Sequence, residues 1–548
     1  MPIRMTPDEP GDDQRQRPQM PRQRGGGFPN IGGGGGGGMI GMLLPMLLKN
    51  PKLLLIGVAI LAVIYFMGGM DGCGGAMPDD PNNPGGGGGI TDVISNLFNK
   101  GATLDPAEYD KAEVYEPLAD NVKNPLPERA SLDAFAPPRL NQGQQGSCVA
   151  WASAYAARSI VQNKATGAAP NKGTAFSPSF MYNRIKIENS GCQGSYILRA
   201  MDDMLKRGAV PLSQFAYTDQ SCSTRPDAAV EQSASRYKIK GFQRLSKSDD
   251  PQSPVDMVAM KQYLSQGSPI VIGMMVGGTF MQEMQGQDVW LPSASDQRMA
   301  GFGGHAMCVI GYDDYKLGGQ NGGAFQIMNS WGTEWGKNGI AWVPYDAFQY
   351  FTKEAYAVYP MGESAEVKPA NFDIRFGLAV VDDKGKATGE NIALKHMDGR
   401  TFRTERPLPK GTRFKVEVTN NLECYTYIFG QETNGTTYTL FPYTPKHSPY
   451  CGVTGTRVFP KDFSLELDDV GTMDVMAIMV TNQPFDYPAI NKALTANAGQ
   501  GLNAKLEAVL GGELTGANSA QYQQGATFGA KAPASANALA IVIEVEKR

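Results

Sequence analysis

The sequence predicts an α+β fold of two packed lobes for residues 126–360, followed by a mostly β domain over residues 372–548. Three observations lead to this prediction. Segments with the apolar period of an amphipathic helix dominate the first half of residues 126–360. Short apolar segments between Gly, Asn and Asp turns dominate its second half. Beyond a linker at residues 361–371, apolar and polar residues alternate, which is typical of strands with one buried face.

The helices and strands of the first domain can be assigned individually. The predicted helices are Cys148–Asn163, Tyr196–Arg207 and Pro254–Gln266. The predicted strands are Ile270–Val276, Ala306–Tyr312, Ala324–Asn329 and Gly339–Pro344. Because most of the helices precede the strands in the chain, we expect one helical lobe and one strand-rich lobe.

The C-terminal region is predicted to be a β-sandwich with a helical insertion. Asn434-Gly435 separates two apolar segments, and this dipeptide is a strong signal for a hairpin turn. Residues 487–535 are rich in Ala, Gly and Asn and contain a predicted helix at Leu502–Leu510. The predicted strands are Phe372–Val381, a segment around residues 414–418, Cys424–Phe429, Thr436–Phe441, Met473–Val480 and Leu539–Val545.

The first 125 residues do not have the composition of a folded core. Residues 1–38 are polar and end in a run of glycines, so we expect them to be disordered. Residues 39–70 are a predicted membrane segment. Within it, residues 53–70, at ~1.5 Å per residue, reach ~27 Å, enough for one transmembrane helix. Residues 71–125 are a predicted Gly/Pro-rich tether and short pre-segment.

Charges on the two sides of residues 53–70 predict the orientation of this helix. Arg and Lys precede it, whereas Asp71, Asp79 and Asp80 follow it, so the N-terminus is expected in the cytoplasm. The chain would then be a single-pass protein of the inner cell membrane that contacts lipid through this helix, with its two domains periplasmic or extracellular. A cleaved signal peptide is the alternative, but the leader is long for one.

Composition excludes several classes of function. A net charge of −4 does not indicate a nucleic-acid partner. The three histidines, His305, His396 and His447, form no HExxH motif, and the seven cysteines form no CxxC motif. We therefore expect no metal site and no cofactor.

One cysteine lies behind a glycine turn at the start of a predicted helix. The segment reads Asn141-Gln142-Gly143-Gln144-Gln145-Gly146-Ser147-Cys148. A thiol hydrolase needs a thiolate, and a helix N-terminus would lower the pKa of Cys148. His305 would act as the base, and Asn329 could orient its ring by accepting the second N–H. The amide of Gln142 and the backbone N–H of Cys148 could stabilise an oxyanion.

Five segments in this order resemble the motifs of papain-family cysteine peptidases. They are Leu126-Pro127-Glu128 with Asn141 to Cys148, Gly191-Cys192-Gln193-Gly194-Ser195, Phe215-Ala216-Tyr217, Gly304-His305-Ala306, and Asn329-Ser330-Trp331-Gly332 through Trp335-Gly336. The resemblance spans about residues 126–355. It implies the papain fold and hydrolysis of peptide bonds in a protein or peptide substrate, with Cys148, His305, Asn329 and Gln142 as the catalytic set.

The same resemblance implies residues that contact the substrate. The backbone of Gly194 and Ser195 would hold the substrate chain as an added strand, and Gly304 would lie beside it. Trp331 would shield the bond between the catalytic histidine and asparagine from water. Val149 departs from the family pattern, which has Trp directly after the nucleophile.

Four cysteines could form two disulfides, one in each domain. Cys192 could pair with Cys222, and Cys424 with Cys451, which would suit an oxidising compartment. The alternative is four reduced, partly buried thiols. Gln145 replaces the cysteine that the papain family pairs with Cys192, so that family disulfide is absent.

The C-terminal region resembles bacterial β-domains of unknown function that have a strand ending in Leu-Phe-Pro. The matching segments are Thr439-Leu440-Phe441-Pro442 and Ile478-Met479-Val480-Thr481-Asn482. Such a domain could bind a protein or cell-wall partner, or only stabilise the peptidase. Three functions stay open: a membrane-anchored peptidase, a catalytically silent peptide-binding adaptor, and a cell-wall amidase or transpeptidase.

Overall fold

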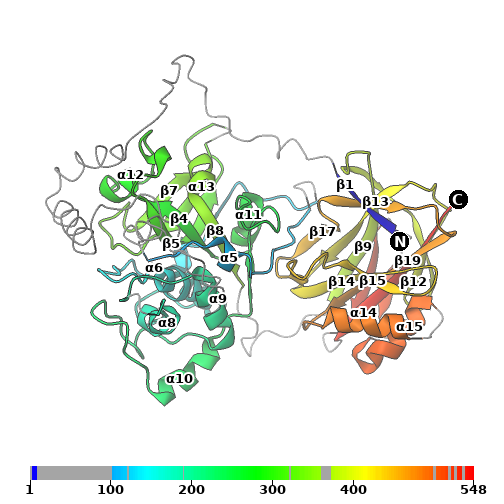
Figure 1. Cartoon of the computed structure of the whole chain (residues 1–548), viewed down its shortest axis with the longest axis horizontal. Coiled ribbons are helices and arrows are strands. Elements are labelled where there is room, and N and C mark those ends of the chain that lie inside the picture. Colours follow the sequence, from blue (N-terminus) through cyan, green and yellow to red (C-terminus); the bar gives the residue numbers. More distant parts are fainter. Residues whose placement is uncertain are drawn as a thin grey trace, which may run out of the picture. The chain divides into compact units, whose positions relative to one another are not determined.

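The computed structural model describes residues 3–8, 101–119, 123–188, 191–319, 322–359, 372–497, 501–515, 520–523, 527–533 and 537–548. All of them fall in one compact unit of the chain. Residues 101–359 form a two-lobe domain, and residues 372–548 form a C-terminal domain of β-sheets and two helices (Figure 1).

One long helix forms the centre of the helical lobe. It consists of α6 (Cys148–Ala150), a π-helical stretch η2 (Trp151–Arg158) and α7 (Ser159–Thr166). Gly167 follows it with φ of 66°, a left-handed conformation that ends helices. The other helices of this lobe are α8 (Pro178–Ile185), α9 (Ile197–Lys206) and α10 (Ala228–Ala234). The predicted helices that begin at residues 148 and 196 are confirmed.

A single antiparallel sheet forms the other lobe. Its strand order is β3-β8-β4-β5-β6-β7, and β2 also pairs with β5. The strands are β2 (Arg129–Ser131), β3 (Phe242–Arg244), β4 (Ile270–Val276), β5 (Gly303–Asp313), β6 (Ala324–Met328), β7 (Ile340–Pro344) and β8 (Thr352–Val358). Helices α11 (Met257–Ser265), α12 (Gly278–Gln282) and α13 (Tyr345–Phe351) accompany it. The four predicted strands are all present.

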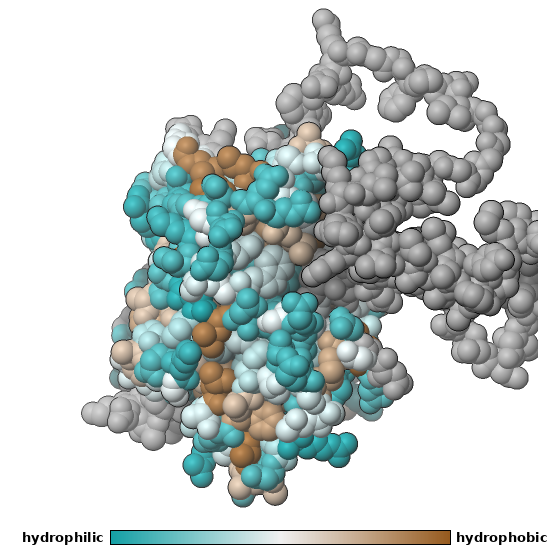
Figure 2. Space-filling model, turned by 90° about the vertical axis from the view of Figure 1, so that its left-hand side faces the viewer, coloured by the Kyte–Doolittle hydropathy of each residue, from teal (hydrophilic) through white to brown (hydrophobic). Residues whose placement is uncertain are grey.

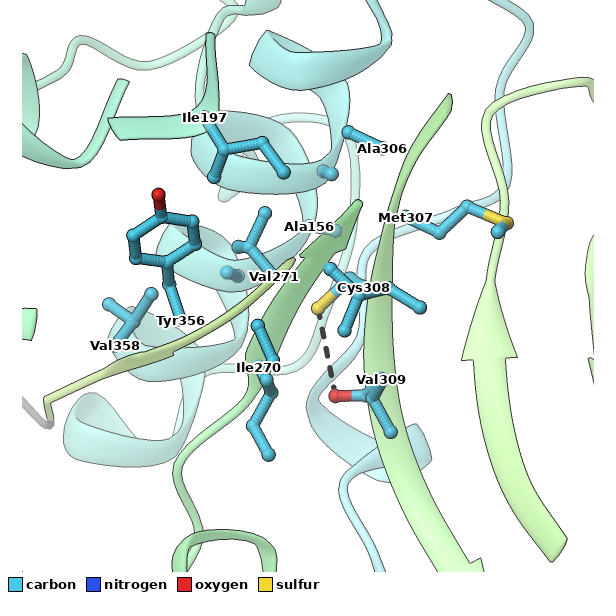
Figure 3. Packing of buried hydrophobic residues seen from close by; sticks show 14 of the residues in the cluster. Ala156, Ile197, Ile270, Val271, Ala306, Met307, Cys308, Val309, Tyr356 and Val358 are labelled. Atoms are coloured by element: carbon cyan, nitrogen blue, oxygen red, sulfur yellow. Dashed lines mark hydrogen bonds between the residues drawn. The ribbon is translucent and has the colours of Figure 1, made fainter. Parts of the chain in front are cut away.

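An apolar core joins the two lobes. Figure 3 shows Ala156 of the long helix, Val271 of β4, and Cys308 and Val309 of β5 within it. The Cys308 thiol donates a hydrogen bond to the Val309 carbonyl at 3.8 Å. Because interiors are close-packed, this core fixes the long helix against β5. The active-site candidates lie on these two elements and on the end of β6.

The C-terminal domain is a sandwich of two sheets, as predicted. One sheet has the order β1-β18-β13-β9-β21-β20, with β10 and β17 at its side, and the other has β11-β12-β22-β19-β14-β15, with β16 at its side. Side chains alternate along the strands, so Ile428 faces the core between the sheets while Tyr427 and Phe429 pack under helices α14 (Tyr487–Ala496) and α15 (Gly501–Leu510). The strands after β8 are β9 (Phe372–Val381), β10 (Ala387–Asn391), β11 (Leu394–Asp398), β12 (Thr401–Thr404), β13 (Arg413–Asn420), β14 (Cys424–Gln431), β15 (Thr437–Phe441), β16 (Tyr450–Cys451), β17 (Gly455–Phe459), β18 (Phe463–Leu467), β19 (Met473–Thr481), β20 (Gln521–Gln523), β21 (Phe528–Ala532) and β22 (Ala538–Glu546).

The chain begins with a strand, although we expected all of residues 1–38 to be disordered. Strand β1 (Ile3–Pro7) pairs antiparallel with the edge of β18 in the C-terminal domain. Asp8 follows it and accepts hydrogen bonds from Arg413 at 2.9 Å and from Lys415 at 2.6 Å. The prediction failed at these residues because it averaged the composition of the whole leader and could not see a backbone pairing with a remote edge.

The two-lobe domain begins earlier than we expected. Residues 101–119 were predicted to belong to the tether, but Ala102, Tyr109 and Tyr115 are buried in the core of this domain. Their short helix is α5 (Pro106–Tyr109), capped by the Asp105 carboxylate.

Several predicted segments lie outside the residues that the structure describes. They are residues 9–38 of the leader, the membrane segment 39–70, the rest of the tether before residue 101, and the linker at residues 361–371. Among the described residues, none of the helices combines the length and apolar character that crossing a bilayer requires. One face of the protein is mostly hydrophilic, with apolar residues in small groups (Figure 2), which is ordinary for a surface in contact with water.

Candidate active site

Cys148 is the first residue of α6, behind the predicted glycine turn. Gly143 has φ of 65°, a conformation that favours glycine. At Gly146, a Cβ would come within 2.9 Å of the backbone nitrogen of Gly194, and the Gly146 N–H donates to the Cys192 carbonyl at 3.0 Å. The missing side chain at Gly146 therefore lets the start of the helix lie against the loop that carries the predicted substrate-binding residues.

His305 and Asn329 come from two neighbouring strands. His305 lies near the start of β5, and Asn329 directly follows β6, which pairs with β5. The His305 Nε2 and the Asn329 Oδ1 are 2.8 Å apart, and both side chains are buried. Because a carbonyl oxygen only accepts, this bond assigns the proton to Nε2. Nδ1 is then the ring nitrogen that can exchange a proton with a nucleophile.

The thiol of Cys148 contacts the strand that carries His305. Its Sγ accepts a hydrogen bond at 3.4 Å from the backbone N–H of Ala306, which follows His305 in the chain. A helix N-terminus and two adjacent strands therefore bring Cys148, His305 and Asn329 to one place.

Burial raises the pKa of the Cys148 thiol to about 12, while backbone N–H groups, chiefly that of Ala306, act in the opposite direction. The expectation of a lowered pKa is wrong for this state because the thiol is fully covered. A Cβ on Gly101 would come within 3.0 Å of Sγ, so residue 101 lies directly over the sulfur. A thiol with this pKa stays protonated near neutral pH.

Gln142 is held at the junction of the two lobes. Its Oε1 accepts from the Ser330 hydroxyl at 2.6 Å, and its Nε2 donates to the Gln145 carbonyl at 2.9 Å. The backbone N–H of Gln142 donates to the Ser330 carbonyl at 2.8 Å. An amide nitrogen carries two hydrogens, so Nε2 retains a second N–H for another acceptor. Two hydrogen bonds therefore hold Gln142 against Ser330, the residue after Asn329.

Trp331 stacks on the imidazole of His305. Their ring centroids are 4.5 Å apart, with an interplanar angle of 28°. Trp331 is in turn packed against the rings of Phe280 and Trp335, each with a centroid distance of 5.9 Å. The indole therefore covers one face of the histidine ring and limits its rotation.

Residues 101–105 of the chain lie along the site as an extended segment. The Ser195 N–H donates to the Gly101 carbonyl at 3.1 Å, and the Thr103 N–H donates to the Ser195 carbonyl at 2.9 Å. The Ala102 N–H donates to the Gly304 carbonyl at 3.2 Å. Ser195 and Gly304 thus bind a main chain in the way predicted for a substrate. We call residues 101–119 the strap and residues 101–105 its groove end.

The structure separates the roles of Gly194 and Ser195. The N–H of Gly194 donates to the Tyr182 hydroxyl at 2.9 Å, and its carbonyl accepts from Ile187 at 3.0 Å, so both of its backbone groups are engaged within the helical lobe. The Ser195 hydroxyl donates to the Ile185 carbonyl at 2.8 Å, which leaves the backbone of Ser195 to pair with the strap. Of these two residues only Ser195 pairs with the strap, and substrate binding by Gly194 and Ser195 stays a prediction.

Glu354 on β8 is a site residue that sequence reasoning missed. Its carboxylate accepts from the N–H of Asp105 at 3.1 Å, where the groove end of the strap leaves the site. Glu354 is buried, and burial raises its pKa to about 8. An acidic residue within an apolar strand was the available signal, but it belongs to none of the motifs.

The predicted disulfides have different outcomes. Cys192 and Cys222 form a disulfide, as expected. Cys424 and Cys451 lie opposite each other on β14 and β16 but are free thiols, so their predicted pairing is wrong for this structure. The Cys451 thiol instead forms a hydrogen bond of 3.3 Å with the Thr426 hydroxyl.

Comparisons with known proteins match two regions of this chain. Residues 129–361 match the papain family cysteine protease profile, and residues 408–484 match a domain of unknown function, DUF4384. A peptidase C1-like protein of Acanthamoeba polyphaga mimivirus is 30% identical over 38% of this chain and 64% of its own length. Cathepsin K of Mus musculus is 28% identical over 38% of this chain and 56% of its own length. The chain thus spans less than two thirds of the length of these curated relatives.

Among solved structures, xylellain, a cysteine protease from Xylella fastidiosa, is 24% identical with a TM-score of 0.37, over 46% of this chain and 92% of that one. The papain family profile covers all of the residues that carry the predicted motifs from Asn141 to Gly336. Residues 129–361 of this chain are a papain-family cysteine protease domain.

Proposed function

We propose that the chain is a cysteine peptidase that hydrolyses peptide bonds in protein or peptide substrates. The observation that carries this proposal is the 2.8 Å bond between His305 and Asn329 beside the thiol of Cys148. It supplies an oriented base next to a nucleophile, and the base already has the tautomer that the reaction needs.

Each side chain has one task in the proposed reaction. Nδ1 of His305 takes the proton of Cys148, and the thiolate attacks the carbonyl carbon of the scissile peptide bond. The imidazolium then gives its proton to the leaving amine, and a thioester remains on Cys148. Water attacks the thioester after giving a proton to His305, and the acid product leaves while the thiol regains its proton. Asn329 holds the ring in place throughout.

The developing oxyanion needs donors that are already in position. The backbone N–H of Cys148 is one proposed donor, and the second N–H of the Gln142 amide is the other. Because Ser330 fixes Gln142, this amide would not have to reorganise during the reaction. The groove next to it takes an extended main chain, as the strap shows, and this supports a peptide substrate.

The described state is closed to such a substrate. Gly101 covers the sulfur of Cys148, and the strap already uses the backbone groups of Ser195 and Gly304. The groove end therefore has to leave before a substrate can bind. The raised pKa of the covered thiol fits a resting form that does not attack.

A strap variant tests the proposed activity. Thr103→Pro removes the N–H that donates to Ser195, without changing any proposed catalytic group. We expect this variant to cleave a denatured protein and to be alkylated at Cys148 by a thiol-directed epoxide, whereas Cys148→Ala in the same background should do neither. Peptide binding without cleavage would contradict hydrolysis and indicate an adaptor. Cleavage of cell-wall peptides alone would indicate a cell-wall amidase.

We also propose that the peptidase works outside the cytoplasm and is held at a membrane. The disulfide between Cys192 and Cys222 supports an oxidising compartment. The apolar residues 53–70 support attachment to lipid. Fractionation of cells that express the full chain, with and without residues 39–70, tests the attachment. Recovery of both forms in the water-soluble fraction would contradict it.

A further inference from the structure

The strap continues from the groove to the C-terminal domain. At its middle, the N–H of Val114 donates to the Lys446 carbonyl at 2.7 Å, and the Val114 carbonyl accepts from the Ser448 N–H at 3.0 Å. The neighbouring residues 113 and 115 pair with the backbone of Arg244 in the two-lobe domain, at 2.9 Å and 3.0 Å. Residues 113–115 therefore act as a shared strand, with one edge on each domain.

A buried charge cluster holds the next residue. The Tyr443 hydroxyl donates to the carboxyl of Glu116 at 3.2 Å, and Nε of Arg457 donates to the Glu116 carbonyl oxygen at 3.0 Å. Arg457 is itself buried and fixed by Asn420 at 2.8 Å and by the Val453 carbonyl at 2.8 Å. The C-terminal domain thus presents a preformed site for the backbone and the side chain of Glu116.

Two outer contacts lie on either side of this cluster. The Lys446 ammonium binds Asp110 at 2.7 Å, and the Ala119 N–H donates to the Thr456 carbonyl at 2.7 Å. Residues 110–119 are therefore bonded to the C-terminal domain at several positions, while Gln262 of the two-lobe domain also accepts hydrogen bonds from Tyr115 and Leu118. We call them the clamp end of the strap.

Different parts of the protein hold the two ends of the strap. Three backbone hydrogen bonds and the Glu354 contact hold the groove end. The free energy gained from these few hydrogen bonds is opposed by the conformational entropy lost when five residues become ordered. A tether that keeps a segment near its site raises its effective concentration there. The clamp end supplies such a tether, since residue 110 follows the groove end by five positions.

We propose that the C-terminal domain is the clamp that keeps the strap in the active-site groove, so that the peptidase is latent only while this domain holds residues 110–119. This inference rests on the proposed function. The region that matches DUF4384 would then serve as a binding site, within the same chain, for the strap. Whatever separates the strap from residues 443–457 would open the groove.

Hydrogen exchange in the full chain tests this proposal without requiring catalysis. In a Cys148→Ala background, the amides of Ala102 and Thr103 report directly on the groove end. Val114→Pro removes the bond to Lys446 but leaves the bonds of residues 113 and 115 to Arg244 in place. Glu116→Lys places a cation beside Arg457. We expect both changes to speed exchange at these two amides by at least about tenfold.

Glu116→Gln is the matched control. Its amide oxygen can still accept from the Tyr443 hydroxyl, so at about pH 4, where Glu116 is uncharged in the closed and open forms alike, exchange at Ala102 and Thr103 should stay at the parent rate. Unchanged exchange in both Val114→Pro and Glu116→Lys would overturn the proposal. If Glu116→Lys unfolds the C-terminal domain, fast exchange in the groove still supports the clamp and slow exchange still overturns it. Because the readout is independent of hydrolysis, an inactive Thr103→Pro variant would contradict the proposed function and leave this result standing.

Discussion

Replacing Asn329 should slow the proposed hydrolysis while leaving the nucleophile Cys148 and the base His305 in place. Asn329→Ala deletes the acceptor 2.8 Å from His305 Nε2 and leaves a buried ring nitrogen without its partner. Losing a buried bond to a group that becomes charged costs roughly 1.5–3 kcal/mol, which corresponds to a fall of about 10- to 100-fold in kcat. The measurement is steady-state kinetics in the Thr103→Pro background. A kcat within about twofold of the parent would contradict the orienting role.

The thiol of Cys148 should titrate differently in the closed and open forms. Burial raises its pKa to about 12 when the strap covers it, so alkylation of the full chain by iodoacetamide should keep accelerating far into alkaline pH. Uncovering the sulfur in Thr103→Pro removes part of the desolvation and should move the alkylation profile to lower pH. Cys148→Ala provides the background from the other cysteines. Identical profiles for the closed and open forms would contradict the covering role of Gly101.

Residue-level prediction succeeded where the signal was local. Cys148, His305 and Asn329 each lie in a short motif, and the structure brings all three together. The pKa of Cys148 could not be predicted, because its largest determinant is burial that includes residue 101, far away in the sequence. Gly194 and Ser195 show the same limit, since only hydrogen bonds to Tyr182 and Ile187 distinguish their roles.

At the level of elements, strand β5 begins where the strap binds and where we propose that a substrate binds. A Cβ at Gly304 would come within 2.2 Å of the Ala102 carbonyl oxygen, so Gly304→Ala should expel any main chain from this position. We expect alkylation of Cys148 by a small reagent to become faster while peptide hydrolysis falls. Measuring both rates on one preparation separates this outcome from general misfolding, which would change the thermal unfolding midpoint as well. Faster peptide hydrolysis would contradict the shared position.

Regular elements could largely be predicted, whereas the strap could not. Strands β4 and β9 have the predicted bounds because apolar pattern and turn residues define them. The groove end of the strap forms through backbone hydrogen bonds between residues that are remote in sequence, and such pairing leaves no side-chain pattern. Strand β1 was missed for the same reason.

At the scale of the whole molecule, two buried carboxyl groups make strap binding depend on pH. Burial raises the pKa of Glu116 and of Glu354 from 4.5 to about 8; Glu116 belongs to the clamp end of the strap and contacts Tyr443, and Glu354 contacts the groove end. The groups that face Glu116 are Lys461, Asp462, Tyr443 and Arg457, and those that face Glu354 are Asp105, Glu108 and Tyr356.

The sign of the effect follows from proton binding. The closed state retains a proton that an exposed carboxyl would release, so its stability is full below about pH 4.5 and is lost as pH rises towards 8. A fluorescent peptide should therefore bind the Cys148→Ala chain more tightly as pH rises through this window, because it competes with the strap. Glu116→Gln cannot ionise and should flatten part of this dependence. Tighter peptide binding at acid pH would reverse the assignment.

The pairing of β1 with β18 constrains how the chain can be threaded through a bilayer. Strands that share hydrogen bonds lie on the same face of any membrane, so residues 3–8 and the C-terminal domain must do so. The single crossing with a cytoplasmic N-terminus that the flanking charges predict would place these two strands on opposite faces, so it requires a state in which β1 is not paired with β18.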